Sequence, residues 1–378
     1  ISACLVGSEM CIRDRKDSDQ KRNLHDRGAD LLPEGKDGSQ ETTGQHKSLD
    51  IGAEILGENL SCIISTHIDD IKGSGDQKVR EALLTALRRD YGGDVKIEKG
   101  EFEHTGIMHK QNADFSIYTS QEHYVKEISE ISLSTVSTDN PDEPLPDSMQ
   151  SLFWSLLGAL AWLQQTRADI APYIGFLQRN AHKPNIGHVQ KANLLLRYVR
   201  RVKAGIRFQK LPTPLRMVTV ADSAYKADDQ LTECIALRGY IILIVGTPRD
   251  KHSHNGQFPG GPCTVLDWVS KKFNTVTRSS FCAELGNQLE AAQSSVFLSS
   301  SLEENIMEIS SSEELVKRQD DGLLHTPTIL CGDNKGVFTA TSAQNPKTPA
   351  EPTLTAHVKA LREFIDKGLI TALSWVDN

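Results

Sequence analysis

The stretch RMVTVAD at residues 216–222 is the best guide to the fold of the C-terminal part of the chain. Its β-branched and apolar residues predict a strand that closes on an aspartate. Two more runs of this kind follow at 240–245 and 265–269, and helical spacing then predicts a helix over 280–298. We expect the last elements to be a strand at 328–331, a helix at 355–366 and a strand at 369–376. This order predicts an α/β (α+β) domain with a mixed sheet and flanking helices.

Three carboxylates occupy positions that this order of elements would bring together. Asp222 ends the first strand, Glu284 lies in the first turns of the helix, and Asp333 follows the fourth strand. Clustered carboxylates hold hard divalent cations such as Mg2+ or Mn2+, and a bridging carboxylate can bind two of them for phosphodiester hydrolysis. We therefore predict a metal-binding catalytic site made of these three residues.

Each carboxylate also has an interpretation without chemistry. Asp222 and Asp333 could simply begin turns, and Glu284 could complement the positive end of a helix. The joint placement of all three favours the metal site over these separate explanations.

A second acidic motif, His67-Ile68-Asp69-Asp70, lies upstream. It follows a strand-like run at 60–66 and precedes a glycine-rich turn and a helical pattern. Polymerases present paired aspartates at such a hairpin, where the carboxylates bind the metal ions that assist phosphoryl transfer. The pair alone is weak evidence, because Asp-Asp also occurs in exposed turns. Asp69 and Asp70 are therefore candidate metal ligands whose support comes from their context.

Composition limits the remaining classes of function. The 378 residues carry a net charge of −8, so bulk electrostatic coating of nucleic acid is excluded and any contact must be local. The candidate basic cluster consists of Arg197, Arg200, Arg201 and Lys203, with Arg207 and Lys210 nearby. A solvated helix face is the alternative for this cluster.

The longest apolar runs are too short for a membrane helix, and the seven scattered cysteines suggest neither a zinc site nor a disulfide framework.

The pattern along the chain predicts five segments. Residues 1–15 resemble translated adapter sequence, and 16–55 have the composition of a disordered leader. We expect a partial palm at 56–146 with a hairpin around Gln111, then a helical thumb or connection at 147–212. The mixed-sheet domain takes 213–378. Both ends of the chain look truncated.

Motifs in both regions resemble the Pol polyprotein of copia-type retrotransposons, with its reverse transcriptase and ribonuclease H. In the last domain the matching blocks are Val220-Ala221-Asp222-Ser223-Ala224, Leu237-Arg238-Gly239-Tyr240, Leu266-Asp267-Trp268-Val269-Ser270-Lys271-Lys272, Thr277-Arg278-Ser279-Ser280-Phe281-Cys282-Ala283-Glu284 and Gly332-Asp333-Asn334-Lys335. Upstream, the blocks are His67-Ile68-Asp69-Asp70, Glu103-His104-Thr105-Gly106, Gln121-Glu122-His123-Tyr124-Val125 and Thr166-Arg167-Ala168-Asp169-Ile170. Their order and spacing follow the family.

The resemblance implies a ribonuclease H-like fold after a partial palm, and a two-metal hydrolysis of RNA in RNA–DNA hybrids. It implies metal-ligand roles for Asp222, Glu284 and Asp333, with Mg2+ or Mn2+ as cofactor. Implied partners are the hybrid, template-primer nucleic acid, and the integrase and protease segments of the polyprotein. Implied locations are cytoplasmic virus-like particles and the nucleus, and no membrane is involved.

The chain departs from the family at several points. His67 stands where the family usually has tyrosine, and Ala168 where it has proline. The first palm aspartate is not matched, so we expect no polymerase activity, and Asp377 is wrongly placed for the fourth ribonuclease H carboxylate. Two alternatives stay open: a non-catalytic, degenerate transposon remnant that at most binds nucleic acid, and an integrase-like nuclease on the same fold. The second leaves the paired aspartates unexplained.

Overall fold

The computed structural model describes residues 9–14, 62–67, 70–91, 95–226, 235–247, 260–307, 309, 311–344, 349 and 351–376. The chain divides into two compact units, residues 5–105 and residues 106–378 together with 1–4. Among the helices in these described ranges, none is both long and apolar enough to cross a membrane. The leader expected at 16–55 lies outside the described residues.

The smaller unit is a four-stranded sheet with one helix. Its strands run in the order β2-β3-β1-β4. Their bounds are β1 Glu9–Asp14, β2 Cys62–His67, β3 Asp70–Gly75, β4 Val95–Lys99 and, outside this sheet, β5 Glu101–His104. Helix α1 (Gln77–Tyr91) packs Leu83 and Leu87 against apolar side chains of β3 and β4. We expected residues 1–15 to lie outside the fold, whereas Glu9–Asp14 pairs with β3 and β4.

The second unit begins with a small antiparallel sheet, in which β6 (Ile107–Gln111) pairs with β7 (Ile117–Ser120) and β7 pairs with β8 (Ile206–Phe208). The hairpin predicted around Gln111 therefore joins β6 to β7. Between β5 and β6 the chain passes through Thr105 and Gly106, which both have positive φ. A β-strand cannot continue through two such residues, so the chain turns there.

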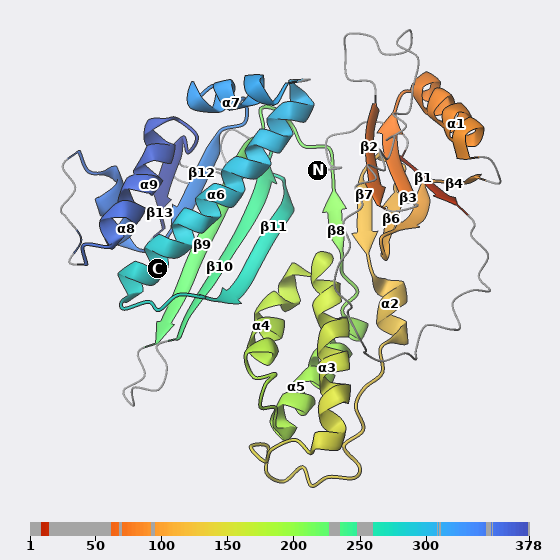
Figure 1. Ribbon diagram of the computed structural model, residues 1–378, viewed down its shortest axis with the longest axis vertical. Helices are drawn as coiled ribbons and strands as arrows, with labels where there is room; N and C mark the ends of the chain where they lie inside the picture. Colours follow the sequence, from red (N-terminus) through yellow and green to blue (C-terminus); the bar gives the residue numbers. More distant parts are fainter. Residues whose placement is uncertain are drawn as a thin grey trace, which may run out of the picture. The chain divides into compact units, whose positions relative to one another are not determined.

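The helical region that follows has its own apolar core. Its helices are α2 Glu122–Glu127, α3 Asp147–Trp162, α4 Ala171–Arg179 and α5 Ile186–Arg201, with single 3-10 turns at Leu163–Gln165 and Ala168–Ile170. Figure 1 shows α3, α4 and α5 packed side by side, and Phe153, Leu160, Ile174 and Leu196 are among the side chains buried between them. Asn185 caps α5, because its side chain accepts the backbone N–H of His188.

The rest of the unit is a five-stranded mixed sheet in the order β11-β10-β9-β12-β13. Strands β9, β10 and β11 are antiparallel neighbours, whereas β12 and β13 run parallel to β9. Their bounds are β9 Arg216–Lys226, β10 Ile235–Val245, β11 Cys263–Lys272, β12 Thr328–Gly332 and β13 Ala372–Trp375.

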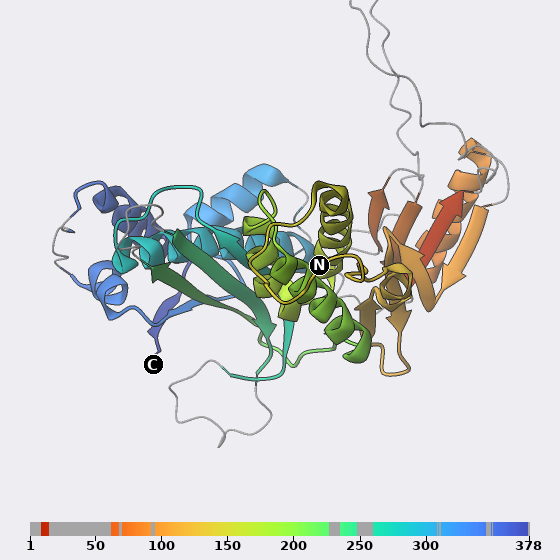
Figure 2. The same ribbon diagram turned by 90° about the horizontal axis from the view of Figure 1, so that it is seen from below.

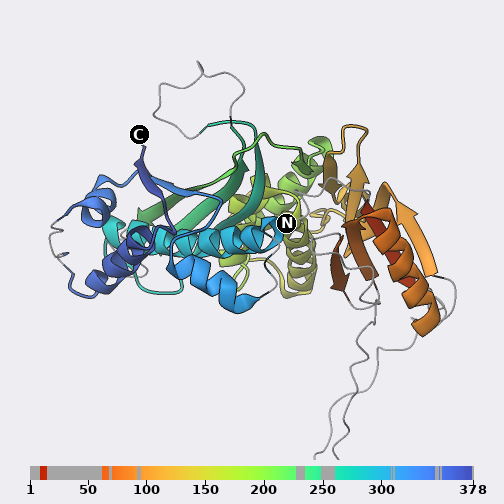
Figure 3. The same ribbon diagram turned by 90° about the horizontal axis from the view of Figure 1, so that it is seen from above.

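Helices α6 (Ser280–Ile306), α7 (Ser312–Asp320) and α9 (Leu354–Asp366) lie on one side of this sheet, as Figures 2 and 3 show. Helix α6 crosses β9 and β10 and buries Leu285, Ala291 and Ala292 against them (Figure 1). Helix α8 (Lys335–Ser342) directly follows β12.

The predicted order of strands and main helices in this domain is confirmed, with two differences. Helices α7 and α8 were not expected. Helix α6 extends to Ile306, beyond the expected end at residue 298. The prediction ended too early because the last turns are rich in serine and lack apolar spacing. The hydroxyls of Ser295 and Ser300 donate to the carbonyls of Ala291 and Val296 one turn earlier, so these residues fit inside the helix.

Candidate metal centre

The structure brings Asp222, Glu284 and Asp333 together. One carboxylate oxygen from each lies within 4.8 Å of the others, and this is the one such group of three among the described residues. The parallel pairing of β9 with β12 explains two of the positions, because Cys331 lies opposite Val220 and an aspartate follows each two residues later. Both aspartates therefore reach the same edge of the sheet, at the point where β12 ends and β9 continues.

Helix α6 supplies the third carboxylate. Its N-terminus is fixed by Ser279, whose hydroxyl accepts the backbone N–H of Cys282 at 3.1 Å. Glu284 then lies in the second turn of the helix, and its Oε1 accepts the backbone N–H of Ser223 at 3.1 Å. The residue that follows Asp222 in β9 thus holds the Glu284 side chain against the strand.

Glu284 is only 4% exposed, yet its carboxylate is incompletely satisfied. Its Oε2 is buried and has no hydrogen-bond partner. Burial raises the pKa of Glu284 to about 7, although the hydrogen bond from Ser223 lowers it, and the nearby charges of Asp333 and Asp222 raise it further. A buried carboxylate with an unpaired oxygen and two acidic neighbours is unfavourable without a cation, so the donor set fits a hard divalent metal bound by oxygen.

Two further side chains contact the backbone of the acidic residues, and neither was predicted from the sequence. The indole of Trp375, at the end of β13, donates to the carbonyl of Asp333 at 3.0 Å. The ammonium group of Lys335 lies 5.2 Å from the centre of the same ring. The carboxamide of Asn287 donates to the carbonyl of Asp222 at 2.7 Å. These contacts join residues that are 42 and 65 positions apart, and no local pattern reveals them.

The upstream acidic pair is only partly visible. Asp70 begins β3, is buried, and lies opposite His67 in the β2–β3 pairing. Asp69 lies outside the described residues, as does Asp377. In the part of the chain that the structure describes, Asp70 belongs to no group of three metal-binding side chains.

The structure divides the predicted basic cluster. Arg197 and Arg200 both pair with Glu130, and Arg200 also donates to the carbonyl of Ile128. Arg201 does not share these contacts and instead lines a cavity of about 660 Å³, beside Tyr173. These arginines therefore do not present a single positive surface.

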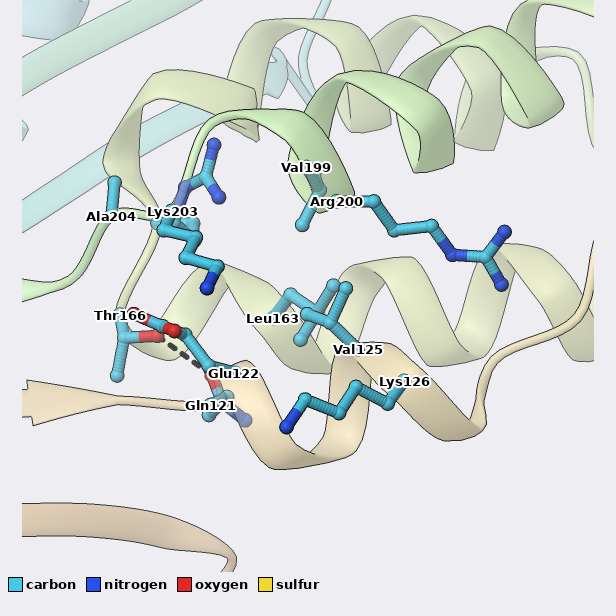
Figure 4. Close-up of a pocket in the computed structure, with 11 residues that line it drawn as sticks. Gln121, Glu122, Val125, Lys126, Leu163, Thr166, Val199, Arg200, Lys203 and Ala204 are labelled. Carbon is cyan, nitrogen blue, oxygen red and sulfur yellow. Dashed lines mark hydrogen bonds between the residues drawn. The ribbon is translucent and has the colours of Figure 1, made fainter.

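Lys203 and Arg200 both line another cavity, of about 310 Å³, together with Lys126 and Glu122. Figure 4 shows the Lys203 side chain directed into this cavity, whereas Arg200 lines the cavity with its guanidinium end directed away from Lys203. A carboxylate in the cavity wall offsets part of the positive charge of the two lysines.

No protein-family model and no curated protein matches the chain. Among solved structures, the ribonuclease H1 of the halophilic archaeon Halobacterium salinarum NRC-1 aligns with 43% of this chain and 85% of its own, at 13% identity and a TM-score of 0.23. A foamy viral protease-reverse transcriptase, solved in complex with dsDNA, aligns with 83% of this chain at 14% identity and a TM-score of 0.21. The chain spans 55% of the length of that protein.

At these TM-scores the alignments add nothing to the fold assignment, which rests on the topology. Three antiparallel strands, two parallel strands beside the first of them, and a long helix across one face define a ribonuclease H-like mixed sheet. Within that fold, an acidic group able to hold a divalent metal lies at the edge of the central strand.

Proposed function

We propose that the mixed-sheet domain hydrolyses the RNA strand of RNA–DNA hybrids with the help of two divalent metal ions. The observation that carries this proposal is the convergence of Asp222, Glu284 and Asp333, in which the most buried member has an unpaired oxygen. A site built only for stability would pair that oxygen with a donor, as proteins do for most buried polar atoms.

The three carboxylates would hold the metal ions through oxygen, the ligand atom that Mg2+ and Mn2+ prefer. When bound, such ions activate a water molecule and neutralise charge on the phosphate. Glu284 must lose its proton to act as a ligand, and the backbone N–H of Ser223 stabilises the ionised form at Oε1. The ion itself would compensate for the remaining buried charge.

We further propose that the whole chain is part of a copia-type Pol polyprotein, with β2 and β3 as a piece of the palm. The supporting observations are the motifs quoted above and the position of Asp70 in the β2–β3 pairing. Template-primer nucleic acid, the integrase and protease segments, and a location in cytoplasmic particles and the nucleus belong to this proposal. A two-metal polymerase site needs a carboxylate beyond Asp69 and Asp70, so we propose no polymerase activity for these residues alone.

Cleavage of a labelled hybrid by the full chain tests the main proposal. We expect the RNA strand to be cut with Mg2+ or Mn2+ and left intact with EDTA, while single-stranded RNA and duplex DNA of the same sequence are not cut. A full chain that folds but leaves the hybrid intact with both metals would favour the non-catalytic remnant.

A further inference from the structure

Asn287 is a fully buried polar residue that the mechanism above does not use. It lies one turn after Glu284 on α6 and is 0% exposed. Its Nδ2 donates to two carbonyl oxygens, that of Asp222 at 2.7 Å and that of Gly239 at 2.9 Å. Asp222 and Gly239 lie directly opposite each other in the β9–β10 pairing. One side chain of α6 therefore joins both strands at the position of a candidate metal ligand.

The orientation of this carboxamide is determined by its surroundings. A reversed amide would place Oδ1 against the two carbonyl oxygens, and three acceptors would then face one another without a proton. In the observed orientation, Oδ1 is buried without a partner. Burying an amide with one atom unsatisfied is unfavourable, so the two hydrogen bonds to the strands must offset that penalty.

The contact ties β9 to α6 a second time. The backbone N–H of Ser223 already donates to Glu284, three residues before Asn287 on the helix. The carbonyl of Asp222 and the N–H of Ser223 belong to one peptide group, so consecutive turns of α6 hold the two ends of this single planar unit of β9. Two such links restrict both the sliding and the rotation of the strand relative to the helix.

We infer that Asn287 is a positioning residue, which fixes the backbone of Asp222 relative to Glu284 so that both carboxylates can bind the same metal site. This inference rests on the proposed function. Side chains that orient metal ligands typically change metal affinity or activity by about 10- to 100-fold when they are removed.

The test is the Asn287→Ala substitution in the full chain, measured with Mn2+ alone. The first readout is the Mn2+ concentration that gives half of the metal-induced rise in the thermal unfolding midpoint. We expect that concentration to rise at least about tenfold. The second readout is amide hydrogen exchange in the metal-free protein, which we expect to speed up at residues 222–224 and 238–240 more than elsewhere in the sheet.

Asn305→Ala is the matched control. Asn305 lies on the same helix and loses the same atoms, but its Nδ2 donates only to the carbonyl of Ser301, one turn earlier. We expect its Mn2+ response to equal that of the wild type. Asn287→Ser keeps a polar group but cannot bridge the two carbonyls, so it should also raise the required Mn2+ concentration, and it replaces the alanine variant if that variant does not fold.

The outcomes separate the inference from the proposed function. If the wild type responds to Mn2+ and the Asn287 variants respond at the same concentration, the positioning role is overturned and the metal site stands. If the folded wild type does not respond to Mn2+, the metal site fails and the inference fails with it.

Discussion

The two ends of helix α6 each bury a glutamate, and their surroundings differ completely. Near the C-terminal end, Glu303 is 0% exposed and both of its oxygens are bonded. Arg318 donates to Oε1 at 2.6 and 3.0 Å, and the backbone N–H of His325 donates to Oε2 at 2.7 Å. Near the N-terminal end, Glu284 is almost as buried, but it has an unpaired oxygen and two acidic neighbours.

This difference separates a structural carboxylate from one that we propose to bind metal. The protein supplies Glu303 with a counter-ion and a backbone donor, and these connect α6 to α7 and to the segment before β12. At Glu284 the protein supplies one backbone N–H and then adds negative charge nearby. Burial on the same helix therefore does not distinguish the two residues, whereas the hydrogen-bonding partners do.

Replacing Glu284 with Gln should have the largest effect. We expect hybrid cleavage to fall to background and the Mn2+-induced rise in the unfolding midpoint to disappear, because a metal ligand is lost while side-chain size is kept. The metal-free variant should be at least as stable as the wild type, since a buried acidic group is removed. Retained cleavage, or a marked loss of stability without metal, would make Glu284 a structural residue like Glu303.

Replacing Glu303 with Gln should give the opposite result. The neutral side chain leaves Arg318 without its counter-ion, so the free energy of unfolding should fall by roughly 2 to 3 kcal/mol, less than for a fully buried pair because Arg318 is partly exposed. Chemical denaturation measures this change. The Mn2+ concentration for half-maximal stabilisation should stay at the wild-type value. A large shift in that concentration would mean that Glu303 also affects metal binding, which would contradict a purely structural role.

The pH dependence of stability sharpens the same contrast. The pKa of Glu284 is about 7 in the folded protein against an ordinary value of 4.5, so the folded state keeps a proton that the unfolded state releases. The stabilisation from this group is complete below pH 4.5 and is lost as the pH rises to 7, a change on the order of 1 to 3 kcal/mol.

The measurement is the free energy of unfolding in EDTA as a function of pH, for the wild type and for Glu284→Gln. The difference between the two proteins at each pH reports the titration of Glu284. A difference that does not change between pH 4.5 and 7 would mean that Glu284 is ionised normally. With Mn2+ present, the decline should be reversed above pH 7, because the ion binds the deprotonated form.

Trp375→Phe should have the smallest effect. The substitution keeps an aromatic side chain, with a smaller ring, but removes the N–H that donates to the carbonyl of Asp333. Loss of one hydrogen bond of this kind corresponds to about 1 kcal/mol, or roughly a three- to tenfold higher Mn2+ requirement. An unchanged requirement would show that β13 does not help to hold Asp333.

The sequence predicted the parts of the site that depend on the order of elements. Asp222 lies in β9, Asp333 follows the parallel strand β12 and Glu284 lies near the start of the helix, so the strand order brings them together, although β9 continues four residues beyond its expected end at Asp222. Their roles as metal ligands stay predictions. The contacts of Asn287 and Trp375 could not be predicted, because both side chains bond backbone carbonyls far away in the sequence. Every residue has a backbone carbonyl, so the sequence does not indicate which one is the partner.

The basic cluster shows the opposite limit. Arg197 and Arg200 form a positive run with their neighbours in the sequence, yet the structure pairs both with Glu130, which lies 67 and 70 residues away. Charge counted along the chain therefore overstated the positive surface. The strand Glu9–Asp14 was missed for a different reason, since we excluded its segment because it resembles translated adapter sequence, and β-pairing depends on distant partners.

The most direct test of the central claim is a Mn2+ titration of thermal unfolding for the wild type, Glu284→Gln and Glu303→Gln at pH 8. We expect Mn2+ to raise the unfolding midpoint of the wild type and of the less stable Glu303→Gln by the same amount, and to leave that of Glu284→Gln unchanged. An equal rise in all three proteins would contradict it, because the ion would then bind without the Glu284 carboxylate.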